Sequence, residues 1–284
     1  MTKKLTTADL LNLKAAGTRF SAISCYDYTT ATLVAQAGTE MILVGDSAAQ
    51  IMLGHNSTLP ATMDFMVTIT AAVRRGAPNI CLVADMPFLS YQISKEEAIR
   101  NAGRFIVEAS ADIIKVEASA AQLGTIQALS DADIPVMAHI GLRPQTIAKT
   151  GRLKAKGTSA TDAYELILLA DRMVQAGSTT LLLEGTASRV AAIITERVNV
   201  PVIGCGSGPH CDGQILLISD IIGTSQGHLP KFSKKYAELD TAIIDAVKAY
   251  IKDIQSLSFP DDEHSYHIKS EELEKLKTML DPIF

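Results

Sequence analysis

The sequence contains few aromatic residues. Tryptophan is absent, phenylalanine and tyrosine together make up only 5% of the 284 residues, and the formal net charge is −5 with a pI of about 5.7. Proteins that bind nucleic acid by stacking its bases usually carry aromatic side chains on a basic surface. The composition therefore argues against a nucleic-acid partner and against binding to an acidic membrane surface.

Cysteine is also scarce. Cys25, Cys81, Cys205 and Cys211 are scattered and form no CxxC pair, so we expect reduced thiols rather than a disulfide framework. No apolar run approaches the roughly 18 residues that span a membrane, and the first residues lack the apolar core of a signal peptide. We therefore expect a cytoplasmic protein without a membrane partner.

Short apolar runs, in contrast, are abundant. Apolar residues make up 47% of the chain and charged residues 20%, which is enough to bury a large core. The runs are nearly continuous rather than alternating, as is typical of parallel strands that are covered on both faces. They predict strands near residues 20–25, 41–45, 80–84, 112–117, 134–140, 179–183, 200–205 and 216–222.

Amphipathic segments fill most of the gaps between these runs. Ser94 opens one of them and Glu97 follows three places on, which is the pattern of a capping box. Eight strand–helix units in about 220 residues match a single α/β domain of the (β/α)8 TIM barrel type. The main alternative is a doubly wound open sheet, but that fold normally has a glycine-rich first turn, and this sequence has none there. The predicted helices cover 29–38, 94–110, 158–177, 186–199 and 239–256; the predicted domain covers 1–284, with 257–284 as a C-terminal helical extension.

Acidic residues stand where the apolar runs end. The stretch MILVGDS runs directly into Asp46, and later runs end on Asp85 and Glu117. Because the carboxyl ends of barrel strands meet at one mouth, we expect these acids to lie together. A divalent cation would relieve their mutual repulsion, and a ligand set of oxygens favours Mg²⁺ over Zn²⁺. The alternative is that each acid only caps a helix or pairs with a lysine.

Three further residues at strand ends suggest a chemistry for this site. Mg²⁺ with open positions can chelate a 2-oxo acid and stabilise its enolate. Glu184, at the end of an apolar run, is the candidate base for the proton on the adjacent carbon. Lys115 could pair with the substrate carboxylate or the metal-binding acids, or else form an ion pair with Glu117 inside the barrel. His139 could hydrogen-bond the substrate oxygen or be structural.

A series of motifs runs in order from about residue 18 to 267. They are CYDYTTA (25–31), VGDS (44–47), GHNSTLP (54–60), AAVRRGAPN (71–79), ADMPFLSY (84–91), IKVE (114–117), AHIGLRPQ (138–145), PVIGCGSGPHCDGQIL (201–216), GHLPKF (227–232) and DEHSYH (262–267). With these motifs in this order, the chain resembles the ketopantoate hydroxymethyltransferase family.

The resemblance implies a (β/α)8 barrel of the phosphoenolpyruvate/pyruvate type with Mg²⁺ as cofactor. It implies that Asp46 and Asp85 hold the metal directly and that Glu117 lies nearby through water. The implied reaction is the first step of the pantothenate branch. In it a hydroxymethyl group passes from 5,10-methylenetetrahydrofolate, as co-substrate, to 3-methyl-2-oxobutanoate and gives 2-dehydropantoate.

The resemblance also implies roles for the other residues at the strand ends. Ser47, Lys115 and His139 would bind the substrate together with the two metal-binding aspartates, and Glu184 would be the base. Members of this family form large homo-oligomers, so a decamer is expected. The expected partners are thus small molecules and further copies of the chain.

Several loops depart from the family pattern. The chain has GDSAAQ at 45–50, Ala and Ser at 118–119 in place of two glycines, KTGRLKAKG at 149–157 without the usual aromatic residue, and LEGTA at 183–187. These departures leave open a paralogue with the same metal–enolate core, acting as a lyase or transferase on a different 2-oxo acid. A non-catalytic binding role is a third possibility, and the retention of two aspartates and the glutamate base argues against it.

Two features lack an assigned role. The glycine-rich GCGSG at 204–208 falls late in the chain, after the seventh strand, where barrels often hold an anion or the tail of a ligand. A basic cluster could meet the anionic tail of a folate or could be a solvated loop face. Its members are Arg143, Lys149, Arg152, Lys154 and Lys156.

Overall fold

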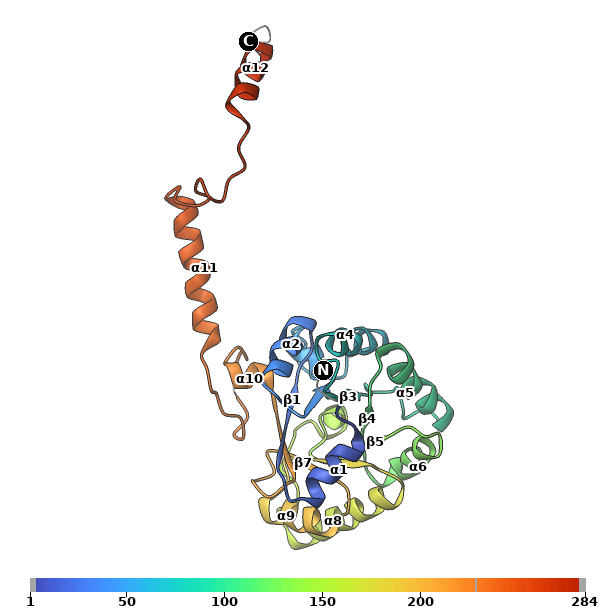
Figure 1. Ribbon diagram of the computed structural model, residues 1–284. Helices are drawn as coiled ribbons and strands as arrows, with labels where there is room; N and C mark the ends of the chain where they lie inside the picture. The colour runs from blue at the N-terminus through green and yellow to red at the C-terminus, as the bar shows by residue number, and fades with distance from the viewer. Residues whose placement is uncertain (1–3, 228, 281–284) are drawn as a thin grey trace. The chain divides into compact units, whose positions relative to one another are not determined.

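The protein forms a closed barrel of eight parallel strands, described here from a computed structural model that covers residues 4–227 and 229–280 (Figure 1). Neighbouring strands pair in sequence order and β8 closes back on β1, which confirms the predicted barrel and excludes the open sheet. The predicted bounds at residues 1 and 284 lie outside the described residues. The strands are β1 (Phe20–Ser24), β2 (Met41–Val44), β3 (Cys81–Asp85), β4 (Ile113–Glu117), β5 (Val136–Gly141), β6 (Thr180–Glu184), β7 (Val202–Cys205) and β8 (Gly213–Leu217).

The eighth strand lies earlier than the sequence predicts. We expected it over 216–222, but β8 ends at Leu217 and residues 218–222 form the short helix α10 (Ile218–Ile222). The apolar run is shared by a strand and a helix, and periodicity alone cannot divide so short a run. Gly223, at a φ of +77°, ends the helix in the left-handed conformation that glycine adopts readily.

The helices form where their caps and apolar faces predict them. Ser94 accepts a hydrogen bond from the Glu97 backbone N–H and so begins α5, as expected from the capping pattern. The predicted helices over 29–38, 94–110, 158–177, 186–199 and 239–256 are confirmed to within a few residues. The longer helices are α1 (Thr7–Ala15), α2 (Tyr28–Gln36), α4 (Met63–Gly76), α5 (Lys95–Ala109), α6 (Leu123–Asp131), α8 (Ala160–Gln175), α9 (Ser188–Arg197), α11 (Leu239–Gln255) and α12 (Ser270–Leu280); the short ones are α3 (Ala48–Ile51), α7 (Ile147–Thr150), and 3₁₀ turns at Ala120–Gln122 and Pro144–Thr146.

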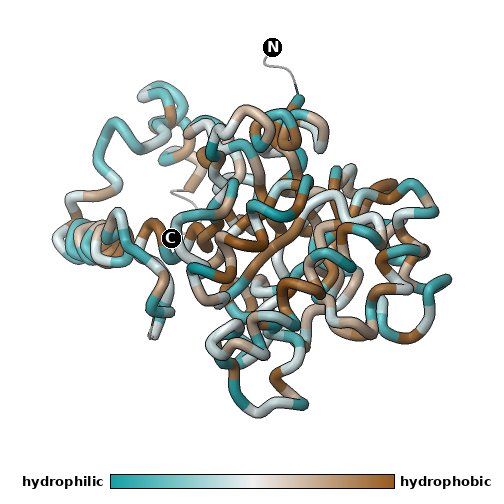
Figure 2. The backbone as a smooth tube through the Cα atoms, turned by 90° about the horizontal axis from the view of Figure 1, so that it is seen from below, coloured by the Kyte–Doolittle hydropathy of each residue, from teal (hydrophilic) through white to brown (hydrophobic). Residues whose placement is uncertain are grey.

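The core has two layers. One lies between the strands and the surrounding helices, and the other fills the barrel itself. Figure 2 shows many hydrophobic, brown stretches of backbone in the middle of the barrel domain. Helix α1 contributes Leu10, which is completely buried beside Phe20 and Met41. The interior of the barrel near the N-terminal ends of its strands is therefore filled by side chains, as in other parallel barrels.

A second compact unit begins at Ala237, after a first unit that ends at Tyr236. It contains α11 and α12. The predicted boundary at 257 lies inside this unit, and an extension that starts there stays a prediction. Along α11, apolar side chains recur at helical spacing and are about half exposed, among them Ile243, Val247, Tyr250 and Ile254.

Two further expectations from composition concern cysteines and membranes. All four cysteines are free and buried, as expected for a protein without a disulfide framework. Among the described residues, none of the helices combines the length and the apolar character that crossing a membrane requires.

Candidate active site

Inward-facing side chains change from apolar to polar along the barrel strands. In β3, Val83 belongs to the barrel core and Asp85 follows it on the same side; in β5, Met137 precedes His139 in the same way. The polar positions thus gather at the C-terminal mouth, where parallel barrels carry their functional groups. The buried ionisable residues there include Asp46, Asp85, Lys115, Glu117 and His139, each at most 4% exposed.

Asp85 is the centre of this group. Its Oδ2 accepts hydrogen bonds from Lys115 Nζ at 2.6 Å and from the Asp46 backbone N–H at 3.0 Å. Its Oδ1 is buried and has no hydrogen-bond partner among the described residues. One oxygen of Asp85 is therefore fixed by the protein, while the other is left without the partner that a buried carboxylate oxygen requires.

Burial, together with the nearby Asp46 carboxylate, raises the pKa of Asp85 to about 7 against the opposing effect of Lys115. Burial alone would lower the pKa of Lys115. The carboxylates of Asp85, Asp46 and Glu117 outweigh it, so the Lys115 pKa lies above its ordinary value. Lys115 is therefore a fixed positive charge, and its ion-pair partner is Asp85 rather than Glu117.

Gln145 connects three parts of the mouth. Its side-chain amide donates to Asp46 Oδ2 at 2.9 Å and to the Met86 carbonyl at 3.0 Å, and its amide oxygen accepts from Tyr91 Oη at 2.6 Å. Its backbone N–H donates to both oxygens of Glu117, at 3.1 and 3.2 Å. This one neutral residue therefore orients two of the acids that the sequence predicts as metal ligands.

His139 lies between two carboxylates. Its Nε2 is 3.3 Å from Glu184 Oε2 and its Nδ1 is 3.9 Å from Glu117 Oε1, yet neither nitrogen has a hydrogen-bond partner among the described residues. Burial and the positive charge of Lys115 lower the pKa of His139, against the opposing effect of Glu184. The imidazole is therefore neutral near pH 7, with one nitrogen able to donate and the other to accept.

Glu184 is the most accessible acid of the mouth, with 19% of its side chain exposed. It ends β6 beside Gly141 of β5. Gly141 has a φ of +95°, and a Cβ there would lie 2.4 Å from the Glu184 carbonyl oxygen, so only glycine permits this approach. The predicted base is thus held on a rigid strand end with its side chain partly accessible.

Ser47 follows Asp46 at the end of β2. Its Oγ lies 2.8 Å from Tyr26 Oη, and the two hydroxyls share a hydrogen bond. A Cβ at Gly45 would come within 2.9 Å of Ser47 Oγ, so the glycine before the aspartate leaves room for the hydroxyl. The sequence VGDS therefore places a hydroxyl and a carboxylate on consecutive residues at the mouth.

The glycine-rich segment 204–208 holds the neighbouring loop in place. Ser207 is completely buried, and its Oγ donates to the Leu183 carbonyl at 2.7 Å and accepts from the Thr186 backbone N–H at 3.1 Å. The anion that we expected at this segment stays a prediction, while the structure shows that Ser207 fixes the loop that follows Glu184.

The donor set at the mouth suits a hard cation with few protein ligands. Among the described residues, His, Cys, Asp and Glu form no group of three that could hold a metal. Mg²⁺ commonly takes only one or two carboxylates and keeps several waters. Asp46 and Asp85, with Asp85 Oδ1 unpartnered, fit that pattern, whereas the hydrogen bonds of Glu117 go to the Gln145 backbone.

The structure brings all seven predicted site residues to one mouth, from four strands (β3 to β6) and the turn after β2. Sequence reasoning missed Gln145, Tyr91 and Tyr26, which are uncharged and lie outside the strands. Each stands inside a quoted motif, AHIGLRPQ, ADMPFLSY or CYDYTTA, so the motifs marked their positions without showing their contacts. The basic cluster lies at the same end of the barrel and lines two cavities.

Comparisons with known proteins find relatives over almost the whole chain. The sequence model of the family described as Ketopantoate hydroxymethyltransferase matches residues 4–262. A 3-methyl-2-oxobutanoate hydroxymethyltransferase of Thermoanaerobacter sp. (strain X514) is 43% identical over 272 residues, which cover 96% of this chain and 99% of the relative. The enzyme of the same name from Pelobacter propionicus is 45% identical over 268 residues, covering 94% and 99%.

Solved structures with the same fold are more distant in sequence. Phosphonopyruvate hydrolase in complex with oxalate and Mg²⁺ has a TM-score of 0.58 at 14% identity, covering 97% of this chain and 98% of its own. A 2,3-dimethylmalate lyase of the PEP mutase/isocitrate lyase superfamily has a TM-score of 0.59 at 15% identity, covering 91% of each chain. These likenesses confirm the barrel type, and at such identity they concern the fold alone.

Proposed function

The chain belongs to the ketopantoate hydroxymethyltransferase family, and from this premise we propose that it makes 2-dehydropantoate in a Mg²⁺-dependent reaction. A hydroxymethyl group would pass from 5,10-methylenetetrahydrofolate to 3-methyl-2-oxobutanoate, with water supplying its oxygen and tetrahydrofolate released. The observation that carries the proposal is the buried mouth in which Asp85 Oδ1 and both nitrogens of His139 are unpartnered. Unpartnered buried polar atoms at a barrel mouth are typical of groups kept for a ligand.

Asp46 and Asp85 would hold the metal. Gln145 restrains Asp46 through Oδ2, and Lys115 restrains Asp85 through Oδ2, so each carboxylate is oriented before a ligand arrives. When bound, Mg²⁺ would polarise the ketone of the oxo acid and so acidify the proton at C3. Glu117 would contact the metal ion through a water molecule.

Glu184 would accept the C3 proton. Its carboxylate stands on a rigid strand end and is partly accessible, which allows contact with a substrate while most water is excluded. The neutral His139 lies 3.3 Å from it and could donate a hydrogen bond to a substrate oxygen. Carbon C3, relieved of its proton, would then form a bond to the methylene carbon, whose two bonds to folate nitrogens break. Water would supply the hydroxyl group, and the two nitrogens would take up the proton removed from C3 and the remaining proton of that water.

Lys115 and Ser47 would complete the substrate site. The ammonium of Lys115 lies among three carboxylates and offsets part of their charge, which lowers the cost of bringing an anionic oxo acid into the mouth. The Ser47 hydroxyl, shared with Tyr26, offers a hydrogen bond that can be redirected to that substrate.

The direct test is product formation by the purified chain. We expect 2-dehydropantoate from 3-methyl-2-oxobutanoate, methylenetetrahydrofolate and Mg²⁺, detected by mass spectrometry, and none when EDTA replaces Mg²⁺. Absence of product with excess donor and metal would contradict the proposal. Identity above 40% over nearly the whole chain supports this reaction over the paralogous lyase or transferase, for which exchange of the C3 proton without hydroxymethylation would be evidence.

We also propose that the active form is a homo-oligomer, with the decamer of the family as its expected size. The support is the apolar face of α11, where Ile243, Val247 and Ile254 are about half exposed, since a second chain could cover it. Sedimentation of the full chain tests this, and a stable monomer would contradict it.

A further inference from the structure

A basic pocket lies beside Glu184. It has a volume of about 340 Å³. Residues 141–156 form much of its wall, and the end of this stretch is tied to the loop after β6, where the Lys156 N–H donates to the Gly185 carbonyl at 2.8 Å. The pocket therefore opens next to the proposed base rather than on a remote face. Its lining is Gly141, Leu142, Arg143, Thr146, Thr150, Arg152, Leu153, Lys154 and Lys156.

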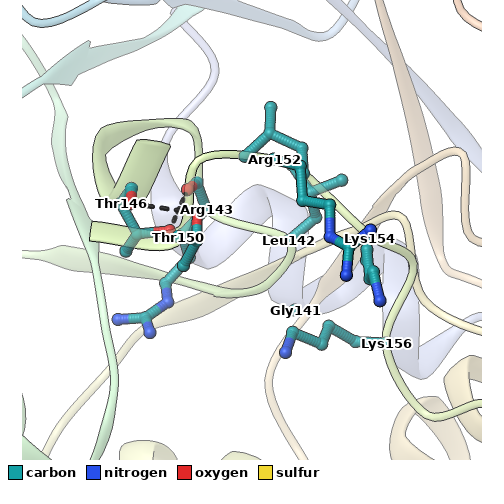
Figure 3. Close-up of a pocket in the computed structure, with 9 residues that line it drawn as sticks. Gly141, Leu142, Arg143, Thr146, Thr150, Arg152, Lys154 and Lys156 are labelled. Carbon is teal, nitrogen blue, oxygen red and sulfur yellow. Dashed lines mark hydrogen bonds between the residues drawn. The ribbon is translucent and has the colours of Figure 1, made fainter. Parts of the chain in front are cut away.

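Positive charge dominates this pocket. Four of its lining residues are cations, and no acidic residue lines it. Figure 3 shows Arg152, Lys154 and Lys156 directed toward one side of the pocket, near Gly141, while the Arg143 guanidinium points away from them. Cations gathered without counter-charge repel one another, and an entering anion would relieve that repulsion.

Some cations of this chain form ion pairs, and others, such as the exposed Arg75 and Arg100, form none among the described residues; the basic pocket is distinguished by having four unpaired cations close together. Arg74 pairs with Asp112, Arg197 with Asp171 and Lys14 with Asp212. Among residues 4–227 and 229–280, in contrast, the four cations of the basic pocket have neither an ion pair nor a hydrogen bond donated by the side chain. A protein with net charge −5 therefore keeps four cations unpaired at the edge of its active site.

A second cavity of about 290 Å³ adjoins the basic pocket and shares Arg143 and Thr146 with it. This cavity is lined by Phe88 and Tyr91 and reaches Glu117 and Gln145 of the catalytic mouth. The two cavities together suit a ligand with a flat ring system near the mouth and an anionic tail leading away. Each is small for a whole cofactor but adequate for one part of it.

We propose that the basic pocket binds the glutamate tail of the folate co-substrate and favours donors with several glutamates; this rests on the function proposed above. Each added glutamate brings one more carboxylate, which the guanidinium of Arg152 can bind through two parallel hydrogen bonds and Lys154 as a point charge. Since these side chains are exposed, each contact contributes modestly and is weakened by salt.

The experiment compares two donors, methylenetetrahydrofolate with one glutamate and with three. In the full-length chain, we expect a lower KM for the triglutamate and a loss of this preference at high salt. The double substitution Arg152→Gln with Lys154→Gln should raise the KM for the triglutamate by roughly three- to tenfold and that for the monoglutamate by less. Lys154→Glu should raise the triglutamate KM more than Lys154→Gln does.

The matched control removes the same charge elsewhere. Arg75 and Arg100 are exposed on α4 and α5, and changing both to Gln should leave the ratio of the two KM values as in the wild type. An unchanged ratio in the Arg152/Lys154 variant, with an unchanged melting temperature, would overturn the inference while leaving the hydroxymethyl transfer intact. Absence of product from either donor in the wild type would instead remove the proposed function and the inference with it.

Discussion

The two ends of the barrel differ in whether their charged side chains have partners. At the N-terminal ends of the strands, Asp112 forms ion pairs with Arg74 and Lys4 and accepts the Leu82 N–H, and Asp212 forms a comparable pair with Lys14. At the C-terminal ends, in contrast, buried atoms of Asp85 and His139 have no partner among the described residues, and four cations stand unpaired.

This contrast shows which end is built for stability and which for function. Paired buried charges stabilise the fold, whereas an unpaired atom of a buried ionisable group costs free energy and is kept where a ligand completes it. Two hydroxyls without a partner among the described residues, those of Ser178 and Thr180, lie at the N-terminal end of β6, but they carry no charge. If the interpretation is right, substitutions at the mouth should impair chemistry or metal binding, and substitutions at the opposite end should impair stability alone.

The largest effect is expected for Glu184→Gln. The amide has nearly the same shape but cannot accept the C3 proton, so the rate of product formation should fall by about 10²- to 10⁴-fold. Mg²⁺ affinity, measured by calorimetry, should stay near the wild-type value because Glu184 is not a proposed ligand. Wild-type turnover in this variant would remove Glu184 from the mechanism.

Asp85→Ala should abolish most Mg²⁺ binding. It removes a proposed ligand and leaves Lys115 without its ion-pair partner, so the loss of affinity should exceed the roughly 100-fold that outer partners of a metal site can cost. Mn²⁺ binding followed by electron paramagnetic resonance provides the measurement. Unaltered Mn²⁺ affinity would show that the metal, if any, binds elsewhere.

Gln145→Leu tests the residue that orients Asp46 and Glu117. The leucine removes the side-chain amide but keeps the backbone N–H, so the contact to Asp46 is lost and that to Glu117 is kept. We expect Mg²⁺ affinity to fall by about 10- to 100-fold, as for other groups that position metal ligands. Gln145→Glu is the charged comparison, since it adds repulsion toward Asp46; metal affinity unchanged in both variants would contradict the role.

The pKa of Asp85 predicts how the affinity for Mg²⁺ should change with pH. A carboxyl whose pKa in the folded, metal-free protein is about 7 is protonated below that pH, and Mg²⁺ binds the ionised form. The increase in melting temperature caused by Mg²⁺ should therefore grow as pH rises from 6 to 8, with apparent affinity falling about tenfold per pH unit below 7. An equal or larger increase at pH 6, at matched ionic strength, would argue against this carboxyl as a ligand.

Asp112→Ala should have the smallest effect on catalysis. It removes two ion pairs and the acceptor of the Leu82 N–H at a site that is largely buried, so the free energy of unfolding should fall by about 2–3 kcal/mol. The turnover rate, measured at a temperature well below the melting temperature of the variant, should stay within about twofold of the wild-type rate. A large loss of turnover with little loss of stability would break the comparison between the two ends.

The sequence was sufficient to predict the barrel and the residues gathered at its mouth. Continuous apolar runs indicated a covered parallel sheet, and because such strands end at one face, acids placed at their ends had to converge. Lys115 was placed correctly, but its partner was left open between Glu117 and the other acids. Only the register of β3 beside β4, which pairs Asp85 with Lys115, decides between them.

The parts that could not be predicted depend on contacts across loops. Gln145 bonds to Asp46, a residue far away in the chain, and no local pattern marks an amide for such a role. The end of β8 was missed because the apolar run continues into α10. The pocket formed by the basic cluster required the fold of the loop over 149–157, whereas the sequence showed only its charge.

The most direct measurement is exchange of the C3 proton of 3-methyl-2-oxobutanoate in D₂O without any folate, followed by NMR. We expect the wild-type chain to remove the C3 methine signal when Mg²⁺ is present, and EDTA to stop this loss of signal. Exchange that proceeds equally with and without Mg²⁺, or no exchange above the protein-free rate when Mg²⁺ is saturating, would contradict the claim that this barrel mouth is built for metal-assisted proton removal.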